Sequence, residues 1–179
     1  MLADRPSHGI VELGGNDAAI VLQDADPAKI AEKLFWGAFT NCGQVCSAVK
    51  RIYVHESLYD DLSARLAGIA KGLKVGDGLD PSSQLGPINN QMQFERVSEL
   101  VDDARQHGAR VLSGGRRIGS AGLFYEPTIL ADVSDGTRIV DEEQFGPALP
   151  LIRYRDVEDA IERANATHFG LSGSVWGGD

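Results

Sequence analysis

The stretch AAIVL at residues 18–22 is a short apolar run, and a second, mostly apolar run, RIYV, follows at residues 51–54. Runs of this length without regular polar alternation are typical of strands buried on both faces. Between them, Asp26 and Pro27 provide an N-cap followed by a proline in the first turn, which predicts a helix from about residue 27 to residue 41. Strand, helix and strand in this order predict a parallel βαβ unit.

The rest of the chain repeats this alternation of short apolar runs and longer amphipathic segments. Helices are predicted from residue 57, where Ser57 and Asp60 resemble a capping box, across residues 90–107, and from Asp156 to about residue 167. Strands are predicted at residues 109–112, 127–130, 149–154 and 171–176. The expected fold class is therefore α/β, a mostly parallel open sheet with helices on both faces.

The composition is that of an ordinary globular domain. The chain has 179 residues, 42% apolar and 24% charged, with a formal net charge of −9. This acidic balance disfavours nucleic acid and anionic membrane surfaces as partners, and no apolar run is long enough to span a bilayer. The only cysteines are Cys42 and Cys46, and the N-terminus lacks the pattern of a signal peptide, so we expect a cytoplasmic protein.

Three short clusters could carry chemistry: ELGGN at residues 12–16, GQVC at residues 43–46 and EEQFGP at residues 142–147. Each also has a plain structural explanation, because paired glycines make turns, free cysteines are commonly buried and acidic pairs are usually solvated. Cys42 and Cys46 are four residues apart, as metal ligands can be. However, the four histidines are scattered singly along the chain, so a zinc site is not favoured.

Taken together, the clusters favour covalent catalysis by a cysteine. Backbone N–H groups in the Gly-Gln loop can stabilise the thiolate of Cys46, which is the nucleophilic form. The oxyanion that forms when a thiolate attacks a carbonyl needs the same kind of donor. Release of the acyl group then requires a base that activates water, and Glu12, next to flexible glycines, is the candidate.

The three clusters, their order and their spacing resemble the signatures of the NAD(P)-dependent aldehyde dehydrogenase superfamily. PTIL at residues 127–130, AN at residues 164–165 and GL at residues 170–171 add to this resemblance, which covers about residues 10–176. The family oxidises aldehydes to carboxylic acids with NAD or NADP. The resemblance therefore implies a small-molecule aldehyde as substrate and one of these two nucleotides as cofactor.

The resemblance also implies catalytic roles. Cys46 would be the nucleophile that forms a thiohemiacetal and then a thioester, and its own N–H would be half of the oxyanion hole. Glu12 would be the general base that activates the deacylating water. Its presence favours hydrolytic release over transfer to coenzyme A. Asn16 departs from the lysine that is commonest at this position of the family, without touching the proposed chemistry.

Four residues would contact the cofactor if the resemblance holds. Glu143 would hold the hydroxyls of the nicotinamide ribose, and Phe145 would pack against the cofactor near the nicotinamide ring. Leu13 and Gly14 would lie beside the nicotinamide. No metal is implied.

Finally, the resemblance implies a domain organisation. Residues 1–179 would form the catalytic, thiol-bearing domain, with the N-terminal dinucleotide-binding domain and the C-terminal oligomerisation strand absent. We therefore expect that this chain alone does not oxidise aldehydes, and that the parent enzyme is a homodimer or homotetramer. Two alternatives stay open: an esterase or acyl-transfer domain that uses Cys46 without a nucleotide, with His55 as the nearest histidine, and a non-catalytic assembly domain.

Overall fold

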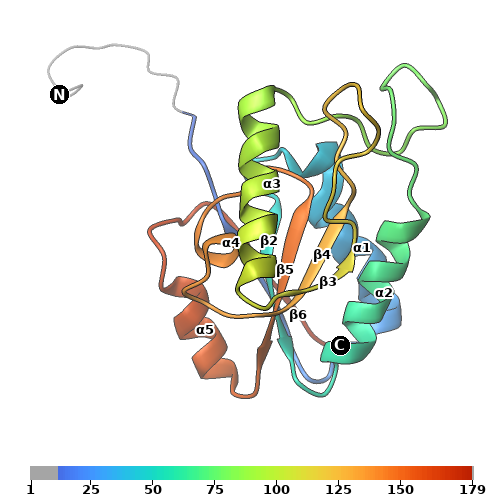
Figure 1. The fold of residues 1–179 in the computed structure, drawn as a ribbon. Coiled ribbons are helices and arrows are strands. Elements are labelled where there is room, and N and C mark those ends of the chain that lie inside the picture. The colour runs from blue at the N-terminus through green and yellow to red at the C-terminus, as the bar shows by residue number, and fades with distance from the viewer. Residues whose placement is uncertain (1–11, 179) are drawn as a thin grey trace, which may run out of the picture.

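The strands in the described part of the chain form one six-stranded sheet. The computed structural model describes residues 12–178. Its strands are β1 Asp17–Val21, β2 Val49–His55, β3 Arg110–Ser113, β4 Thr128–Val133, β5 Ala148–Tyr154 and β6 Gly173–Trp176. Their order in the sheet is β3-β4-β5-β2-β1-β6, and every pair is parallel except the antiparallel pair β3 and β4 at one edge. Figure 1 shows the strands running side by side through the centre of the molecule.

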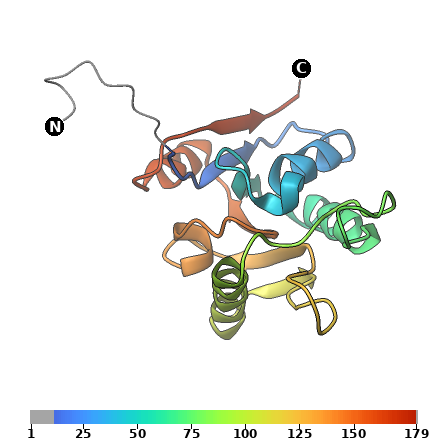
Figure 2. The same cartoon turned by 90° about the horizontal axis from the view of Figure 1, so that it is seen from above.

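Helices cover both faces of the sheet. They are α1 Pro27–Phe39, a 3₁₀ turn η1 Thr40–Gly43, α2 Tyr59–Gly72, α3 Gln91–Gln106, the short α4 Arg138–Asp141 and α5 Val157–Asn165. Helices α1 and α2 lie on one face, and α3, α4 and α5 on the other (Figure 2). This is the layer arrangement that the alternation of strands and helices predicts, because a parallel sheet must bury both of its faces.

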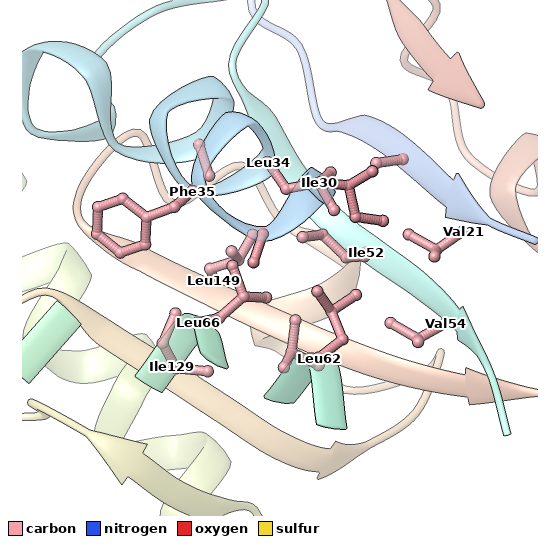
Figure 3. Close-up of a cluster of buried hydrophobic side chains, with 14 of the residues drawn as sticks. Val21, Ile30, Leu34, Phe35, Ile52, Val54, Leu62, Leu66, Ile129 and Leu149 are labelled. Atoms are coloured by element: carbon pink, nitrogen blue, oxygen red, sulfur yellow. The ribbon is translucent and has the colours of Figure 1, made fainter. Parts of the chain in front are cut away.

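Two hydrophobic cores fill the space between these layers, and neighbouring strand residues alternate between them. Ile52 and Val54 pack against α1 and α2, whereas Tyr53, between them, packs on the other face. This period of two follows from the pleat of a strand. Figure 3 shows the first core, whose members from both layers include Leu34, Leu62, Leu66, Ile129 and Leu149.

The N-cap predicted at Asp26 and the helix start predicted at Asp156 are confirmed. Asp26, Asn90 and Asp156 are the N-caps of α1, α3 and α5, and each accepts a hydrogen bond from a backbone N–H of its helix. Gly108, just after α3, has a φ of +94°, a conformation that favours glycine.

Two local predictions were wrong, and one short helix was not predicted. Ser57 does not cap α2: its hydroxyl pairs with Nδ1 of His55 at 2.8 Å, and Leu58 is the N-cap, without a side-chain bond. Helix α1 ends at Phe39 rather than residue 41, because the chain turns there into three residues with positive φ. The short α4 was not predicted, since four residues show no helical period. No helix among residues 12–178 is long and apolar enough to cross a membrane.

Candidate active site

The three sequence clusters meet at one edge of the sheet. Each cluster directly precedes a strand: residues 12–16 precede β1, residues 43–46 precede β2 and residues 142–147 precede β5. These three strands are parallel neighbours in the order β5-β2-β1. The segments that lead into parallel neighbouring strands must lie side by side, because the amino ends of such strands share one edge. The topology therefore assembles a single site from parts up to 135 residues apart in the sequence.

The first and third clusters are in direct contact. The backbone N–H of Gly15 donates to Oε1 of Glu143 at 2.9 Å. A Cβ on Gly14 would lie 2.4 Å from Oε2 of the same carboxylate, closer than real Cβ atoms approach an oxygen. Glycine at position 14 thus lets the Glu143 carboxylate approach the backbone of the first cluster closely.

The first and second clusters also touch. A Cβ on Gly15 would lie 2.4 Å from the carbonyl oxygen of Cys46, which is a backbone atom that cannot rotate away. Gly15 therefore packs directly against the backbone of the proposed nucleophile. Cys46 and Glu12 are both exposed, so their side chains are open to a ligand and to water.

The second and third clusters meet at two glycines. A Cβ on Gly43 would lie 2.2 Å from the carbonyl oxygen of Gly146. Gly43 has a φ of +70°, and the two preceding residues, Asn41 and Cys42, have φ values of 54° and 59°. Such conformations are costly for residues with a Cβ and tend to occur at functional sites, where the surrounding structure holds them in place. Phe145 in the third cluster, with a φ of 47°, is a further case.

Gln44 anchors the loop that carries Cys46. Its Nε2 donates to the carbonyls of Asn41 at 3.1 Å and Pro87 at 3.3 Å, and its Oε1 accepts from the N–H of Asn89 at 2.7 Å. The sequence pattern assigned no role to this amide. Its place between two cysteines in a glycine loop gave no sign of a partner 45 residues away.

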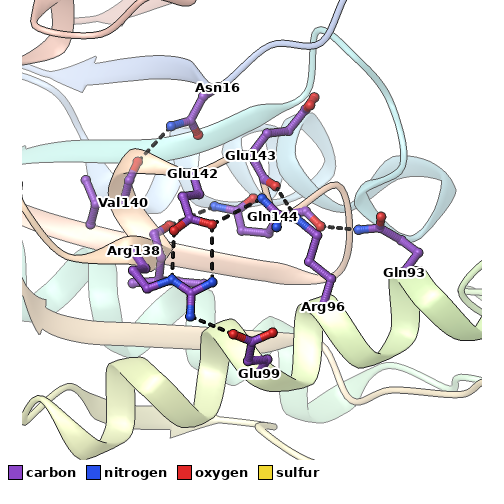
Figure 4. Close-up of polar contacts among 10 residues, drawn as sticks. Asn16, Gln93, Arg96, Glu99, Arg138, Val140, Glu142, Glu143 and Gln144 are labelled. Carbon is purple, nitrogen blue, oxygen red and sulfur yellow. Dashed lines mark hydrogen bonds and ion pairs between the residues drawn. The ribbon is translucent and has the colours of Figure 1, made fainter.

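The two acidic residues of the third cluster have different environments (Figure 4). Glu142 accepts hydrogen bonds from Arg138, at 2.7 Å, and from Arg96, at 3.3 Å, and the bond from Arg138 is the main reason that its pKa is lowered. Arg138 in turn pairs with Glu99 at 2.7 Å. Glu142 is therefore part of an ion-pair network rather than a solvated charge, whereas Glu143 points to the first cluster.

Further polar contacts hold the third cluster in place. Gln93 of α3 donates to the carbonyls of Gln144 and Phe145, and Arg96 donates to the carbonyl of Glu143 at 3.2 Å. Gln144 is fully buried, and its Nε2 donates to the carbonyls of Lys50, at 3.2 Å, and of Ile139, at 3.1 Å. This segment is thus fixed from α3 on one side and from β2 on the other.

Asn16, the last residue of the first cluster, and Asp17, directly after it, have structural roles. The buried Asn16 donates from Nδ2 to the carbonyl of Val140 at 2.7 Å, which ties the first cluster to α4. Asp17 accepts from the N–H of Ser172 at 3.1 Å, and burial raises its pKa. Asn16, which stands where the family most often has lysine, therefore makes a structural contact of its own in this chain.

The two cysteines differ sharply in their environments. Cys42 is 2% exposed, and burial raises its pKa to about 11, against the opposing effect of Lys50. Cys46 is exposed. Because a thiolate is the reactive form of cysteine, the buried Cys42 is the inert one of the pair. Among residues 12–178, no three His, Cys, Asp or Glu side chains are grouped as a metal site.

His55 lies at the wrong end of β2 to assist Cys46. Cys46 precedes the strand, whereas His55 is its last residue, about 20 Å further along at the rise of an extended chain. The His55 ring pairs with Ser57 and packs edge-on against Tyr154. A cysteine hydrolase that relies on this histidine is therefore disfavoured.

Known proteins match both the sequence and the fold. A family model described as aldehyde dehydrogenase family matches residues 3–179. A probable aldehyde dehydrogenase of a Pseudomonas species is 43% identical over 160 residues, which is 89% of this chain and 33% of the relative. A probable succinate-semialdehyde dehydrogenase, NADP(+), of Sinorhizobium fredii is 43% identical over 161 residues, 90% of this chain and 33% of the relative. The NAD+ complex of an aldehyde dehydrogenase from Bacillus cereus has a TM-score of 0.90 at 37% identity, covering 94% of this chain and 34% of that one.

The fold and the site define an α/β domain with an exposed cysteine at the amino ends of its central parallel strands. The chain belongs to the aldehyde dehydrogenase family. It spans about a third of the length of these relatives. Both the family and the mostly parallel α/β fold class predicted from the sequence are confirmed.

Proposed function

We propose that the chain is the catalytic part of an NAD(P)+-dependent enzyme that oxidises an aldehyde to a carboxylic acid through Cys46. The observation that carries the proposal is the position of Gly15, whose N–H binds Glu143 and whose Cα packs against the carbonyl of Cys46. Gly15 thus connects the third cluster, which contains Glu143, to the second cluster, which contains Cys46. Such proximity is what a reaction between two bound partners requires.

Cys46 is the nucleophile in this proposal. Its thiolate sulfur forms a bond to the aldehyde carbon, and the π electrons of the carbonyl move to the oxygen, which gives a thiohemiacetal oxyanion. The N–H of Cys46 lies in the segment that Gln44 anchors, so the donor is held in place before the charge develops. Loss of hydride from the same carbon restores the carbonyl and leaves a thioester on the sulfur.

Glu12 is the base that completes the cycle. It takes a proton from water as the water oxygen bonds to the thioester carbon. The carbon–sulfur bond then breaks, the acid leaves, the thiolate of Cys46 returns, and the exposed Glu12 gives its proton to solvent water. The exposure of Glu12 supports this role, because a base that activates bulk water must reach it.

The residues present fit a nicotinamide nucleotide. The Glu143 carboxylate is held against the backbone of Gly14 and Gly15, so it presents a fixed acceptor for sugar hydroxyls. Glu143 and Phe145 also line a hollow of about 420 Å³, and Leu13, next to Gly14, is 62% exposed. NAD(P)+, when bound, would supply the hydride acceptor. The phosphate group that distinguishes NADP from NAD is not assigned to any of the residues named here, so the proposal includes both cofactors.

The wider organisation of the enzyme is part of the same proposal. Residues 1–179 form the catalytic domain, and the dinucleotide-binding domain and oligomerisation strand belong to a cytoplasmic homodimeric or homotetrameric parent. The support is the one-third coverage of the relatives, which leaves room for both parts. The chain alone is then expected to show no turnover of aldehyde with NAD(P)+.

Intact mass after brief exposure to p-nitrophenyl acetate tests the role of Cys46. The wild-type chain and Cys42→Ala should each gain one acetyl group, and Cys46→Ala should gain none. Cys42→Ala is a matched control, because that thiol is buried and its pKa is raised to about 11. Acetylation that persists in Cys46→Ala, or its absence from the wild type, would refute the assignment of the nucleophile.

A further inference from the structure

Lys50 is a buried cation that the proposed reaction does not use. It lies in β2, is 1% exposed, and makes no ion pair with a carboxylate in the part of the chain that the structure describes. Its ammonium group donates instead to two backbone carbonyls, those of Gly43 and of Gly146, the latter at 3.2 Å. Burying a lysine without a paired carboxylate costs free energy, so a purely structural position would favour a neutral residue.

The two carbonyls belong to the two loops of the site. Gly43 is three residues before Cys46, and Gly146 is three residues after Glu143. The loops pack so closely here that a Cβ on Gly43 would lie 2.2 Å from the Gly146 oxygen and 2.9 Å from the Lys50 nitrogen. Two carbonyl oxygens directed at one point repel each other, and the ammonium group between them turns this repulsion into two charge-assisted hydrogen bonds.

The backbone of Lys50 provides a second link to the same loop. Nε2 of the buried Gln144 donates to the carbonyl of Lys50 at 3.2 Å. The side chain and the backbone of one residue therefore both bind the segment around Glu143, while the side chain alone reaches the loop of Cys46. Lys50 is the point at which β2 holds the two loops relative to each other.

We propose that Lys50, in its protonated form, is a positioning residue that couples the Cys46 loop to the Glu143 loop. This inference rests on the proposed function for its effect on reactivity. The structural part of the inference, that Lys50 keeps the two loops ordered together, does not depend on that function. The charge matters because only the ammonium form donates to both carbonyls with the strength of a charged donor.

The pH profile of Cys46 acetylation by p-nitrophenyl acetate tests the effect on reactivity. Burial lowers the pKa of Lys50 to about 8, while Glu143, Cys42 and Asp17, the groups that face it, act to raise it. The wild-type rate, taken relative to that of Lys50→Met at the same pH, should fall above about pH 8, as Lys50 loses its proton. Lys50→Met should react more slowly at pH 7.5, on the order of 10- to 100-fold, with a rate that rises throughout.

The matched control is Lys33→Met, which removes an exposed lysine of α1 and should follow the wild-type profile. A profile of Lys50→Met that parallels the wild type would overturn the proposal. If the wild type is not acetylated on Cys46 at all, the proposed function fails, and a second measurement then decides the role of Lys50 independently.

That measurement is hydrogen–deuterium exchange of peptides covering residues 43–46 and 143–146. In Lys50→Met both peptides should exchange faster, while peptides from β4 and β5 keep their protection, which shows that the variant is folded. If the variant does not fold, the wild type is compared at pH 7 and pH 9.5 after correction for the intrinsic exchange rate, and both loops should lose protection together. Unchanged exchange, or a change in only one loop, would overturn the coupling.

Discussion

Replacement of Gly15 by alanine probes the contact on which the site depends. The added Cβ would lie 2.4 Å from the carbonyl oxygen of Cys46 and 3.0 Å from Oδ1 of Asp17. Ordinary contact begins at 3.4 Å, so the Cys46 backbone or the first cluster must move by about 1 Å. Neither neighbour can rotate out of the way freely, since one is backbone and the other accepts a hydrogen bond from Ser172.

The expected cost follows from this clash. Overpacking of this kind costs about 1–3 kcal/mol, and the reduced entropy of the unfolded chain on replacing glycine by alanine returns about 0.4–1 kcal/mol. The net loss for Gly15→Ala is therefore about 1–2 kcal/mol, or a fall in melting temperature of about 2–8 °C for a domain of this size. A shift of about 1 Å in Cys46 should also slow its acetylation, on the order of 10- to 100-fold.

The assay is thermal unfolding together with the acetylation rate, and Gly68→Ala is the matched control. Gly68 lies within α2, and apart from the backbone of its own helix no atom of residues 12–178 lies within 4 Å of an added Cβ, so the same substitution there should stabilise the fold by about 0.4–1 kcal/mol and leave acetylation unchanged. A Gly15→Ala variant that melts at or above the wild type and reacts at the same rate would show that the three clusters do not meet as described.

Three further predictions address single contacts. Because the pKa of Lys50 is lowered to about 8 from its usual 10.5, the unfolded chain binds more protons than the native chain between these values. The free energy of unfolding of the wild type should therefore rise relative to that of Lys50→Met between about pH 8 and pH 10.5, by up to about 1.4 kcal/mol per pH unit. Urea titrations in which the difference between the two proteins stays constant across this pH range would contradict this. Gln44→Ala removes the acceptor for the N–H of Asn89 and should cost about 1–2 kcal/mol and slow acetylation of Cys46, so an unchanged rate would show that the loop is held elsewhere. Asp156→Ala removes the N-cap of α5, with bonds at 2.9 and 3.2 Å, and should cost about 0.5–2 kcal/mol in the same urea titration with no effect on acetylation; an unchanged midpoint would argue against the cap.

Local signals predicted the elements well where one residue decides the outcome. The N-caps at Asp26 and Asp156 depend only on bonds within a few residues, so the sequence pattern contains them. The cap predicted at Ser57 is not formed, because the Ser57 hydroxyl pairs with the His55 ring instead of a backbone N–H of α2. A local pattern cannot rank two competing partners.

The contacts that build the site were beyond such reasoning. Asn16 binds the carbonyl of Val140, Gln44 binds the N–H of Asn89, and Lys50 binds the carbonyls of Gly43 and Gly146. Most of these partners lie 45 or more residues away along the chain. No motif in the sequence signalled Lys50, and its burial inside β2 is uncommon for a lysine.

The sequence by itself determined the kinds of the longer elements, their order, and the three clusters whose residue types are suited to thiol chemistry. Periodicity, caps and turn residues act over a few positions, so they can be read without the fold. Only the tertiary structure decided that β5, β2 and β1 are neighbours, and hence that the clusters meet at one edge. Strand order is set by the packing of α1 and α2 on one face and of α3, α4 and α5 on the other, and the free energy of that packing comes from contacts between distant parts of the chain.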